Sequence, residues 1–260
     1  MEKLDWKILK EIAELEKTPI GAYNFRVNGQ LDDRQTTANI DIQTKTDKPG
    51  IDITVKPGTK GESVHIPVVL TETGLKDLVY NDFYIGEGEG TGERILNPRT
   101  EVYLDEGASI TLEMTQIAGV DSTIRDTVVV VGTGGECILN EKLLTDGHQR
   151  AESNMEIILD GEGATGRVVS RSVGKGDSVQ VFRPCMTGKA ASFGHVQCDS
   201  IIMDNAKIKS IPAIDAQSLD AQLIHEAAIG KIAGEQLTKL MTLGLTEKEA
   251  EEQIVNGFLK

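Results

Sequence analysis

Short segments in which apolar and polar residues alternate make up most of this chain between residues 22 and 229. The alternation is clearest at residues 38–42, 51–55 and 109–114, where apolar side chains take every second position. A period of two is typical of β-strands that bury one face. Pro-Gly and Asp-Gly pairs, which favour turns, separate the segments. Short strands with no helices between them predict a sandwich, a barrel or a β-solenoid.

Helical spacing of apolar residues appears near the N-terminus, over residues 4–17. Its apolar positions, at intervals of three or four, are Leu4, Ile8, Ile12 and Leu15. The Thr-Pro pair at residues 18–19 stops the helical pattern, because the residue before a proline disfavours the α conformation. We therefore predict an N-terminal helix in residues 1–18, followed by a β core over residues 19–230.

Two further helices are predicted in a C-terminal segment over residues 231–260. The first spans residues 234–243 and is followed by Gly244, which suits the left-handed position after a helix. The second begins with a capping box of Thr246 and Glu249. The apolar positions of the two helices are Leu237, Leu240, Met241, Ile254 and Phe258. These side chains either pack on the strand core or dock a partner protein, and the pattern alone leaves both accounts open.

Composition narrows the class of protein. The chain has 260 residues, of which 39% are hydrophobic and only 4% aromatic. Small branched side chains must therefore fill the core, as they do where strands stack in a solenoid. The net charge of −14 argues against nucleic acid or an anionic membrane as a partner, because both require a basic face.

The sequence also predicts where the protein works. No apolar run approaches the ~18 residues that a membrane-spanning helix needs, and residues 1–5 do not begin a signal peptide. Three cysteines, an odd number, fit a reducing compartment better than a disulfide framework. We expect a cytoplasmic protein that binds neither nucleic acid nor membrane.

Glycine-rich segments that look like nucleotide-binding loops do not meet the requirements. Residues 86–92 fail both glycine fingerprints, and their two glutamates would repel phosphate. Residues 174–176 (Gly-Lys-Gly) lack both the earlier glycine of a P-loop and the Ser or Thr after its lysine. No Gly-x-Ser-x-Gly sequence indicates serine-centred catalysis. We therefore predict that the chain is not an enzyme and has no nucleotide site of its own.

The candidate chemistry is concentrated in residues 193–231. One strand face there combines Val196, Cys198, Ser200 and Ile202, and the other combines His195, Gln197, Asp199 and Ile201. His225 and Glu226 are adjacent, so they point to opposite faces of a strand. Thiol, imidazole and carboxylate groups are ligands for iron. Free cysteine is also a common core residue, and no Cys-x-x-Cys motif is present, so a purely structural interpretation stays open.

The other two cysteines lie in different surroundings. Cys137 sits among apolar residues and is predicted to be structural. Cys185 follows Arg183 and Pro184, and a nearby guanidinium favours the thiolate form that binds iron. Neighbouring strands lie ~4.8 Å apart, so Cys185 and Cys198 are expected to come close if they occupy adjacent rungs of a stack.

Several short motifs follow one another in a fixed order in the second half of the chain. They are a Cys-Asp pair at residues 198–199, a Pro-containing segment at 211–215, His-Glu-Ala at 225–227, Gln-Leu at 236–237, and a Gly turn and Glu-Ala helix at 244–250 that leads to Gly-Phe at 257–258. This order closely resembles the C-terminal core of the SufB/SufD family, whose members are scaffolds for iron–sulfur cluster assembly. Residues 65–70 and 81–86 also look like this family.

The resemblance has consequences for fold, cargo and partners. It implies a mainly β chain with a right-handed β-helix (solenoid) core between an N-terminal helix and a C-terminal helical segment. It implies a homodimer formed through the core, and a SufC-like ABC-type ATPase bound through the C-terminal helices. The implied cargo is a transient iron–sulfur cluster, expected to be of the 4Fe-4S type.

The resemblance also indicates candidate site residues. Cys198 occupies the position of the family's essential scaffold cysteine, and Glu226 that of a functional glutamate with His225 beside it. Cys185 is a further candidate ligand. The expected partner-binding residues are Leu237, Leu240, Met241, Ile254 and Phe258. The chain departs from longer scaffold members, because it has neither their N-terminal Cys-rich motif nor a Gly-Cys-Gly-Ile-His-like segment.

Two other functions remain open at this stage. A SufD-like partner would complete the ATPase complex without holding a cluster. Chains of that type commonly have glycine where this chain has Glu226, which favours the scaffold. A β-solenoid enzyme acting on acidic carbohydrate would need a cleft rich in carboxylates and basic residues, and no segment of the sequence singles one out.

Overall fold

The structure, a computed structural model, describes residues 50–55, 60–70, 78–86, 95–104, 106–118 and 121–260. The predicted N-terminal helix in residues 1–18 and the predicted strand at residues 38–42 lie outside these residues. The strands predicted at residues 51–55 and 109–114 are present as parts of β1 and β5.

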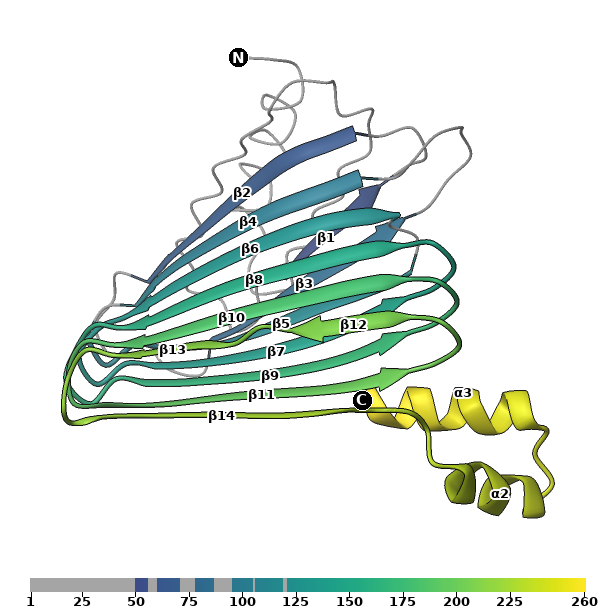
Figure 1. Ribbon diagram of the computed structural model, residues 1–260. Helices are drawn as coiled ribbons and strands as arrows, with labels where there is room; N and C mark the ends of the chain where they lie inside the picture. Colours follow the sequence, from purple (N-terminus) through teal and green to yellow (C-terminus); the bar gives the residue numbers. More distant parts are fainter. Residues whose placement is uncertain (1–49, 56–59, 71–77, 87–94, 105, 119–120) are drawn as a thin grey trace.

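Parallel β-strands form most of the described chain, and two helices follow them (Figure 1). The strands are β1 (Gly50–Val55), β2 (Lys60–Leu70), β3 (Leu78–Gly86), β4 (Ile95–Leu104), β5 (Ser109–Ala118), β6 (Ser122–Val131), β7 (Glu136–Thr145), β8 (Arg150–Leu159), β9 (Thr165–Gly174), β10 (Val179–Gly188), β11 (Ser192–Ile202), β12 (Lys207–Ser210), β13 (Ala213–Ala216) and β14 (Ala221–Gly230). The helices are α2 (Gly234–Thr242) and α3 (Glu247–Phe258).

Successive strands alternate between two facing sheets, which makes the fold a parallel β-solenoid. Sheet A has the order β1-β3-β5-β7-β9-β11-β14, and sheet B has the order β12-β10-β8-β6-β4-β2, with β13 also paired to β10. From β3 to β12, each strand therefore pairs with the strand two places before it, after one turn of the coil (Figure 1). In the last turn β13 pairs with β10 and β14 with β11, three places before. The predicted mainly β solenoid is confirmed, and it explains why no helices interrupt the alternating segments.

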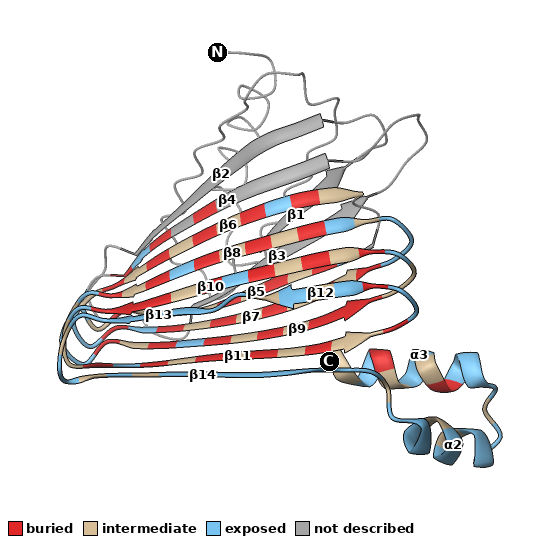
Figure 2. Cartoon of the chain, viewed as in Figure 1, coloured by how far each residue is buried: buried red, intermediate tan, exposed pale blue. Residues whose placement is uncertain are grey.

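The core lies between the two sheets and is built from stacked rows of aliphatic side chains. Leu112, Leu139, Val168 and Val196 are direct neighbours on β5, β7, β9 and β11, and all are at least 98% buried. Buried and less buried residues alternate along the strands, as Figure 2 shows for β6 to β11. Burying apolar area contributes about 25 cal/mol per Å², so this row stabilises each rung against the next.

The last rungs of the solenoid are closely packed near the candidate site. Gly194 takes an inward position on β11, and a Cβ atom there would overlap the Sδ atom of Met186 on β10. The absence of a side chain thus lets a methionine from sheet B cross the interior. The two sheets are therefore in close contact four residues before Cys198.

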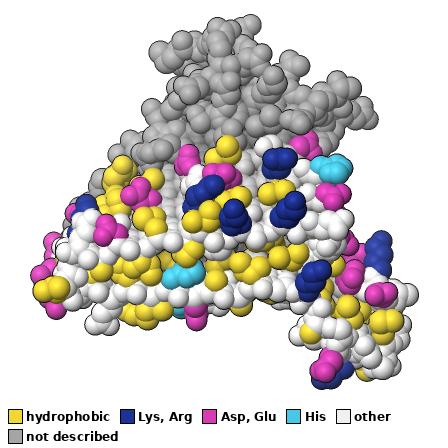
Figure 3. Space-filling view, viewed as in Figure 1, with side chains coloured by type: hydrophobic (Ala, Val, Ile, Leu, Met, Phe, Trp, Pro, Cys, Tyr) yellow, Lys and Arg dark blue, Asp and Glu magenta, His cyan; other side chains and the backbone are white. Residues whose placement is uncertain are grey.

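The solenoid ends in two edges that no further described strand covers. Strand β14 is the edge of sheet A, and β12 and β13 form the edge of sheet B. Ile214 and Ile229 take inward positions, next to buried Met186 and Ser200, yet they are 44% and 41% exposed. In Figure 3, hydrophobic side chains gather along the lower border of the molecule, over these last strands. The end of the solenoid therefore has an apolar surface.

The two helices differ in how they attach to the solenoid. Val255 of α3 is buried against Val173 and Met203, with Phe258 and Leu259 packed beside them. Helix α2 buries none of its residues and is mostly exposed, as Figure 2 shows. None of the described helices is long and apolar enough to span a membrane.

Candidate functional site

Cys198 lies in the interior of the solenoid, on the last strand of sheet A before its edge. Its side chain is 2% exposed and lies between Ser170 of β9 and Ala227 of β14 in the sheet register. Burial raises the pKa of the Cys198 thiol, and the nearby hydroxyls of Ser210 and Ser200 offset part of that effect. The thiol is therefore protonated at neutral pH while the last rung is closed.

His225 and Glu226 lie on the edge strand β14 and point to opposite sides of it, as the sequence predicted. His225 is next to Val196 on the inward face, the face that Cys198 shares. Glu226 is on the outer face, where its Oε1 atom lies 3.0 Å from the Nε2 atom of His195. The sequence did not predict this pair as a contact, because it joins residues 31 positions apart.

The imidazole of His225 is suited to act as a neutral ligand. Its Nε2 atom is buried and has no hydrogen-bond partner in the described residues. Burial lowers the pKa of His225, the neighbouring His195 lowers it further, and Glu226 raises it in part. A neutral imidazole with an unused nitrogen, on the face of the strand that Cys198 shares, can donate a lone pair to a metal.

Cys185 lies on the other sheet from this group, so the condition under which it was expected to approach Cys198, adjacent rungs of one stack, is not met. It is half-buried on β10 of sheet B, at an outward position beside Glu156 and Ala213. The strands β10 and β11 follow one another in the chain but belong to opposite sheets. Residues on these two strands are therefore not neighbours within one sheet. Arg183, the cation expected to act on Cys185, forms an ion pair with Glu152.

The remaining cysteine has a structural environment. Cys137 on β7 is fully buried, and burial, with a smaller contribution from Glu136, raises its pKa to about 12. This agrees with its prediction as a core residue. In the part of the chain that the structure describes, no group of three or more His, Cys, Asp or Glu side chains is placed to hold a metal ion.

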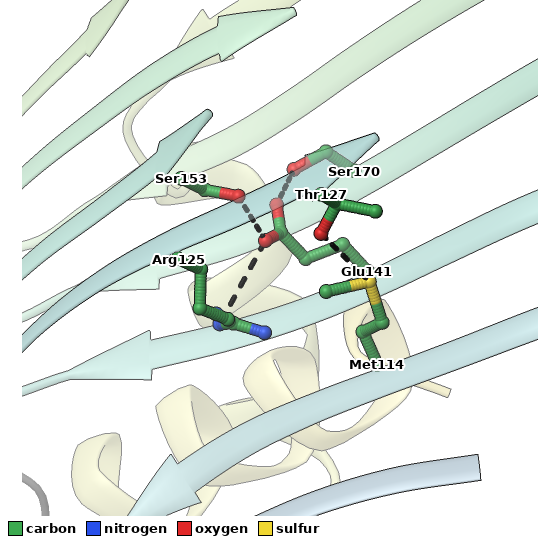
Figure 4. Close-up of polar contacts among 6 residues, drawn as sticks. All are labelled: Met114, Arg125, Thr127, Glu141, Ser153 and Ser170. Atoms are coloured by element: carbon green, nitrogen blue, oxygen red, sulfur yellow. Dashed lines mark hydrogen bonds and ion pairs between the residues drawn. The ribbon is translucent and has the colours of Figure 1, made fainter. Parts of the chain in front are cut away.

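Sequence analysis missed a buried charged cluster inside the solenoid (Figure 4). Arg125 of β6 and Glu141 of β7 are each 1% exposed, with Arg125 Nη2 lying 3.7 Å from Glu141 Oε1. Ser153 and Ser170 each donate a hydroxyl hydrogen bond of 2.7 Å to Glu141, one to each carboxylate oxygen. Hydrogen bonding to both oxygens offsets the cost of burying the charge.

This cluster extends toward Cys198 through the sheet register. Glu141, Ser170 and Cys198 are direct neighbours on β7, β9 and β11, and all three point inward. Glu141 raises the pKa of Cys198 further, through its negative charge. Glu141 could have been recognised from its position between Leu139 and Leu143. It falls on the inward face of the strand, where its two neighbours on that face are apolar.

The C-terminal helices separate the predicted partner-binding residues into two groups. Leu237, Leu240 and Met241 lie on α2, which buries no residue. Ile254 and Phe258 lie on α3, and Phe258 packs against the buried cluster around Val255. The predicted capping box is confirmed, because Thr246 accepts from the Glu249 backbone N–H and Glu249 accepts from that of Thr246. Gly244 has the left-handed φ of 99° that the sequence predicted.

Comparison with known proteins defines the class of this solenoid. Residues 92–258 match the family model described as "SUF system FeS cluster assembly, SufBD core domain". This region contains all the candidate site residues, both helices and most of the strands. The chain belongs to the SufBD family.

Individual relatives support the assignment over different lengths. A SufBD family protein of Methanothermobacter thermautotrophicus is 39% identical over 106 residues, which cover 40% of this chain and 26% of the relative. One from Pyrococcus horikoshii is 31% identical over 191 residues, covering 62% and 43%. The ycf24 protein of Trieres chinensis is 24% identical over 244 residues, covering 90% and 50%. The matched region spans from about a quarter to just over half of these and similar relatives.

Proposed function

We propose that this chain is a scaffold subunit on which an iron–sulfur cluster is assembled at the open end of the solenoid. Cys198 supplies the thiolate and His225 of the edge strand β14 supplies the nitrogen ligand. Glu226 lies on the outer face of β14 against His195, so it supplies its oxygen only after β14 has moved. The observation that carries the proposal is the inward position of Cys198 beside β14, where His225 has a buried Nε2 atom without a partner. Carboxylate and imidazole bind iron less tightly than thiolate, which suits a scaffold that must release its product.

Loading requires the last rung to open. The Cys198 thiol is 2% exposed and its pKa is raised, whereas iron binds the thiolate. Strand β14 is exposed along most of its length and pairs in the described structure only with β11, so its displacement uncovers the thiol at little cost in buried apolar area. Coordination by iron then removes the thiol proton, because a metal ion stabilises the thiolate.

A SufC-like ABC-type ATPase is proposed to drive this opening. Helix α2 presents Leu237, Leu240 and Met241 without burying any of its residues, which leaves them available to a partner. Only residues 231–233 separate the end of β14 from the start of α2. A pull on α2 therefore acts directly on the strand beside Cys198. ATP would be hydrolysed on the partner, because this sequence has no P-loop.

A second copy of the chain is proposed to cover the open end. The exposed side chains Ile211, Ile214 and Ile229 lie there, beside the unpaired edge of β14. An uncovered edge and an apolar end surface both favour association with another chain. A homodimer formed in this way would bring two Cys198 sites together and supply the ligands that one chain lacks.

Cys185 is left out of the proposed ligand set. It lies on the outer face of sheet B, whereas Cys198 points inward from sheet A. The predicted role of Cys185 as a ligand would therefore require it to act from another chain.

A SufD-like partner that holds no cluster is the second candidate. Two observations favour it: the burial of Cys198, and the lack of a group of three metal-binding side chains in the described residues. The two functions differ in one measurable property, the ability of this chain to retain iron and sulfide.

Anaerobic reconstitution with ferrous iron and sulfide tests the proposal. The purified chain should retain iron and sulfide after gel filtration, with the Mössbauer spectrum of a 4Fe-4S cluster. Iron retention no greater than that of the chain denatured before reconstitution would contradict the scaffold and favour the SufD-like partner.

A further inference from the structure

A groove on the outer face of sheet A lies outside the proposed cluster site. It has a volume of about 320 Å³ and is floored by strands β7, β9 and β11, which are labelled in Figure 1. Val169 lies at its centre, with Asn140 and Gln197 on either side in the sheet register. Arg167 and Arg171 are two residues away from Val169 along β9, so both point outward with it.

The groove concentrates positive charge on a chain whose net charge is −14. Lys142 of β7 is the direct neighbour of Arg171 on β9, and both side chains are half-buried on the outer face. Neighbouring strands lie ~4.8 Å apart, so two like charges at this position repel one another. Asp199 of β11 is the neighbour of Arg171 on its other side and offsets part of this repulsion, and a bound anion would offset more of it.

Two described carboxylates lie near these cations: Glu113 lines the groove, and Asp199 of β11 is the direct neighbour of Arg171. Neither forms an ion pair with them. Glu113 accepts a 2.6 Å hydrogen bond from Asn140 Nδ2, and Asp199 accepts a 2.8 Å hydrogen bond from Gln197 Nε2. Each of these two acids is thus hydrogen-bonded to an amide. The groove is lined by four basic residues, Lys142, Arg167, Arg171 and Lys260, and the first three form no ion pair in the described residues.

We propose that this groove binds a small soluble ligand with a phosphate or diphosphate group. The guanidinium of arginine forms paired hydrogen bonds with phosphate oxygens, and two arginines with a lysine match the charge of a diphosphate. A volume of about 320 Å³ lies at the lower end of the range for small-molecule sites. The proposal is independent of cluster assembly, because the groove uses none of the ligands assigned to the cluster.

Calorimetric titration of the full chain with inorganic pyrophosphate tests the proposal. The wild-type chain should bind pyrophosphate, and Arg171→Gln should weaken binding by about ten-fold or more through loss of a bidentate contact. Arg183→Gln is the matched control, because Arg183 lies on the outer face of sheet B in an ion pair with Glu152. The Arg183→Gln variant should bind pyrophosphate with the affinity of the wild type. Citrate serves as the ligand control, and the wild type should bind it at least about ten-fold more weakly than pyrophosphate.

Melting temperature provides a second readout that a purely structural role would not produce. Lys142→Gln should raise the melting temperature of the ligand-free chain, since it removes the repulsion from Arg171, and should reduce the further rise caused by pyrophosphate. Absence of pyrophosphate binding, equal losses in Arg171→Gln and Arg183→Gln, or equal binding of citrate would overturn the proposal. Cluster reconstitution should be unchanged in Arg171→Gln, so failure here is separable from failure of the scaffold function.

Discussion

The three cysteines should differ sharply in reactivity, because thiol alkylation requires exposure and the thiolate form. Cys185 is half-buried on an outer face, whereas Cys198 is 2% exposed and Cys137 is fully buried. Burial raises the pKa of both interior thiols. Iodoacetamide should therefore label Cys185 first in the native chain, as measured by mass spectrometry of its peptides.

The control for this experiment is Cys185→Ala. It should remove the fast phase of labelling without changing the slow one. Labelling of Cys198 as fast as that of Cys185 would show that the last rung is open in the isolated chain.

At the residue scale, the sequence predicted strand faces but not which faces meet. The period of two correctly placed Cys198 with Val196 and Ser200, and His225 opposite Glu226. Cys185 and Cys198 were expected to come close only on adjacent rungs of one stack, and that condition is not met, because β10 and β11 join opposite sheets. Glu141 was missed because its hydrogen-bond partners, Ser153 and Ser170, lie on other strands. A single charged residue on an otherwise apolar strand face does not reveal such partners.

The N-terminus of α3 should depend on pH through its capping box. The backbone N–H of Thr246 lowers the pKa of Glu249 below 4.5, and the Thr246 side chain adds to this effect. The stabilisation is therefore complete above pH 4.5 and is lost as the pH falls through the lower pKa of the folded state. Hydrogen exchange of the first-turn amides should show this step, and Glu249→Ala should abolish it. Glu252→Ala, an exposed change on the same helix, should retain it.

Helix α2 should determine binding of the ATPase. Leu240 is partly exposed on a helix that buries no residue, so Leu240→Asp should abolish co-purification with the ATPase while the circular dichroism of the β core is unchanged. Gln236→Asp is the matched control, since it adds the same charge at an exposed polar position of α2. A complex that persists at native affinity with Leu240→Asp would place the docking surface elsewhere.

At the element scale, both ends of α2 and the start of α3 were predictable to within one residue, because caps act locally. The capping box and Gly244 are short-range signals and were found where expected. The side of α3 that packs was not fully predicted, since Val255 and Leu259 join Phe258 against the solenoid. Which of two adjacent apolar residues is buried depends on how the helix lies against the sheet, and this is a tertiary property.

The open end of the solenoid should govern dimer formation. Ile214→Asp combined with Ile229→Asp places two charges on the apolar end surface without disturbing a buried residue. Light scattering should report a dimer for the wild type and a monomer for the double variant. Ile124→Asp is the control, because Ile124 is 44% exposed at an outward position on β6, away from that end. A wild-type chain that stays monomeric at high concentration, alone and with the ATPase, would contradict the proposed interface.

At the scale of the whole molecule, the pattern of strands left three architectures open. Alternation is the same in a sandwich, a barrel and a solenoid, because each buries one face of every strand. What distinguishes the solenoid is that β9 pairs with β7 and β11 and not with β8 or β10. The sequence has no strict repeat to reveal this pairing, so the choice depended on the family resemblance.

The most direct test of the scaffold function is the iron content of reconstituted variants, read with their Mössbauer spectra. Cys198→Ala should eliminate the cluster signal, and Glu226→Ala should weaken it while the chain stays folded. Cys185→Ala should retain the wild-type signal, because Cys185 faces away from the site. Cys137→Ala should retain it too, at a cost in stability of about 1 kcal/mol. Wild-type iron content and an unchanged spectrum in Cys198→Ala would contradict the assignment of Cys198 as a cluster ligand.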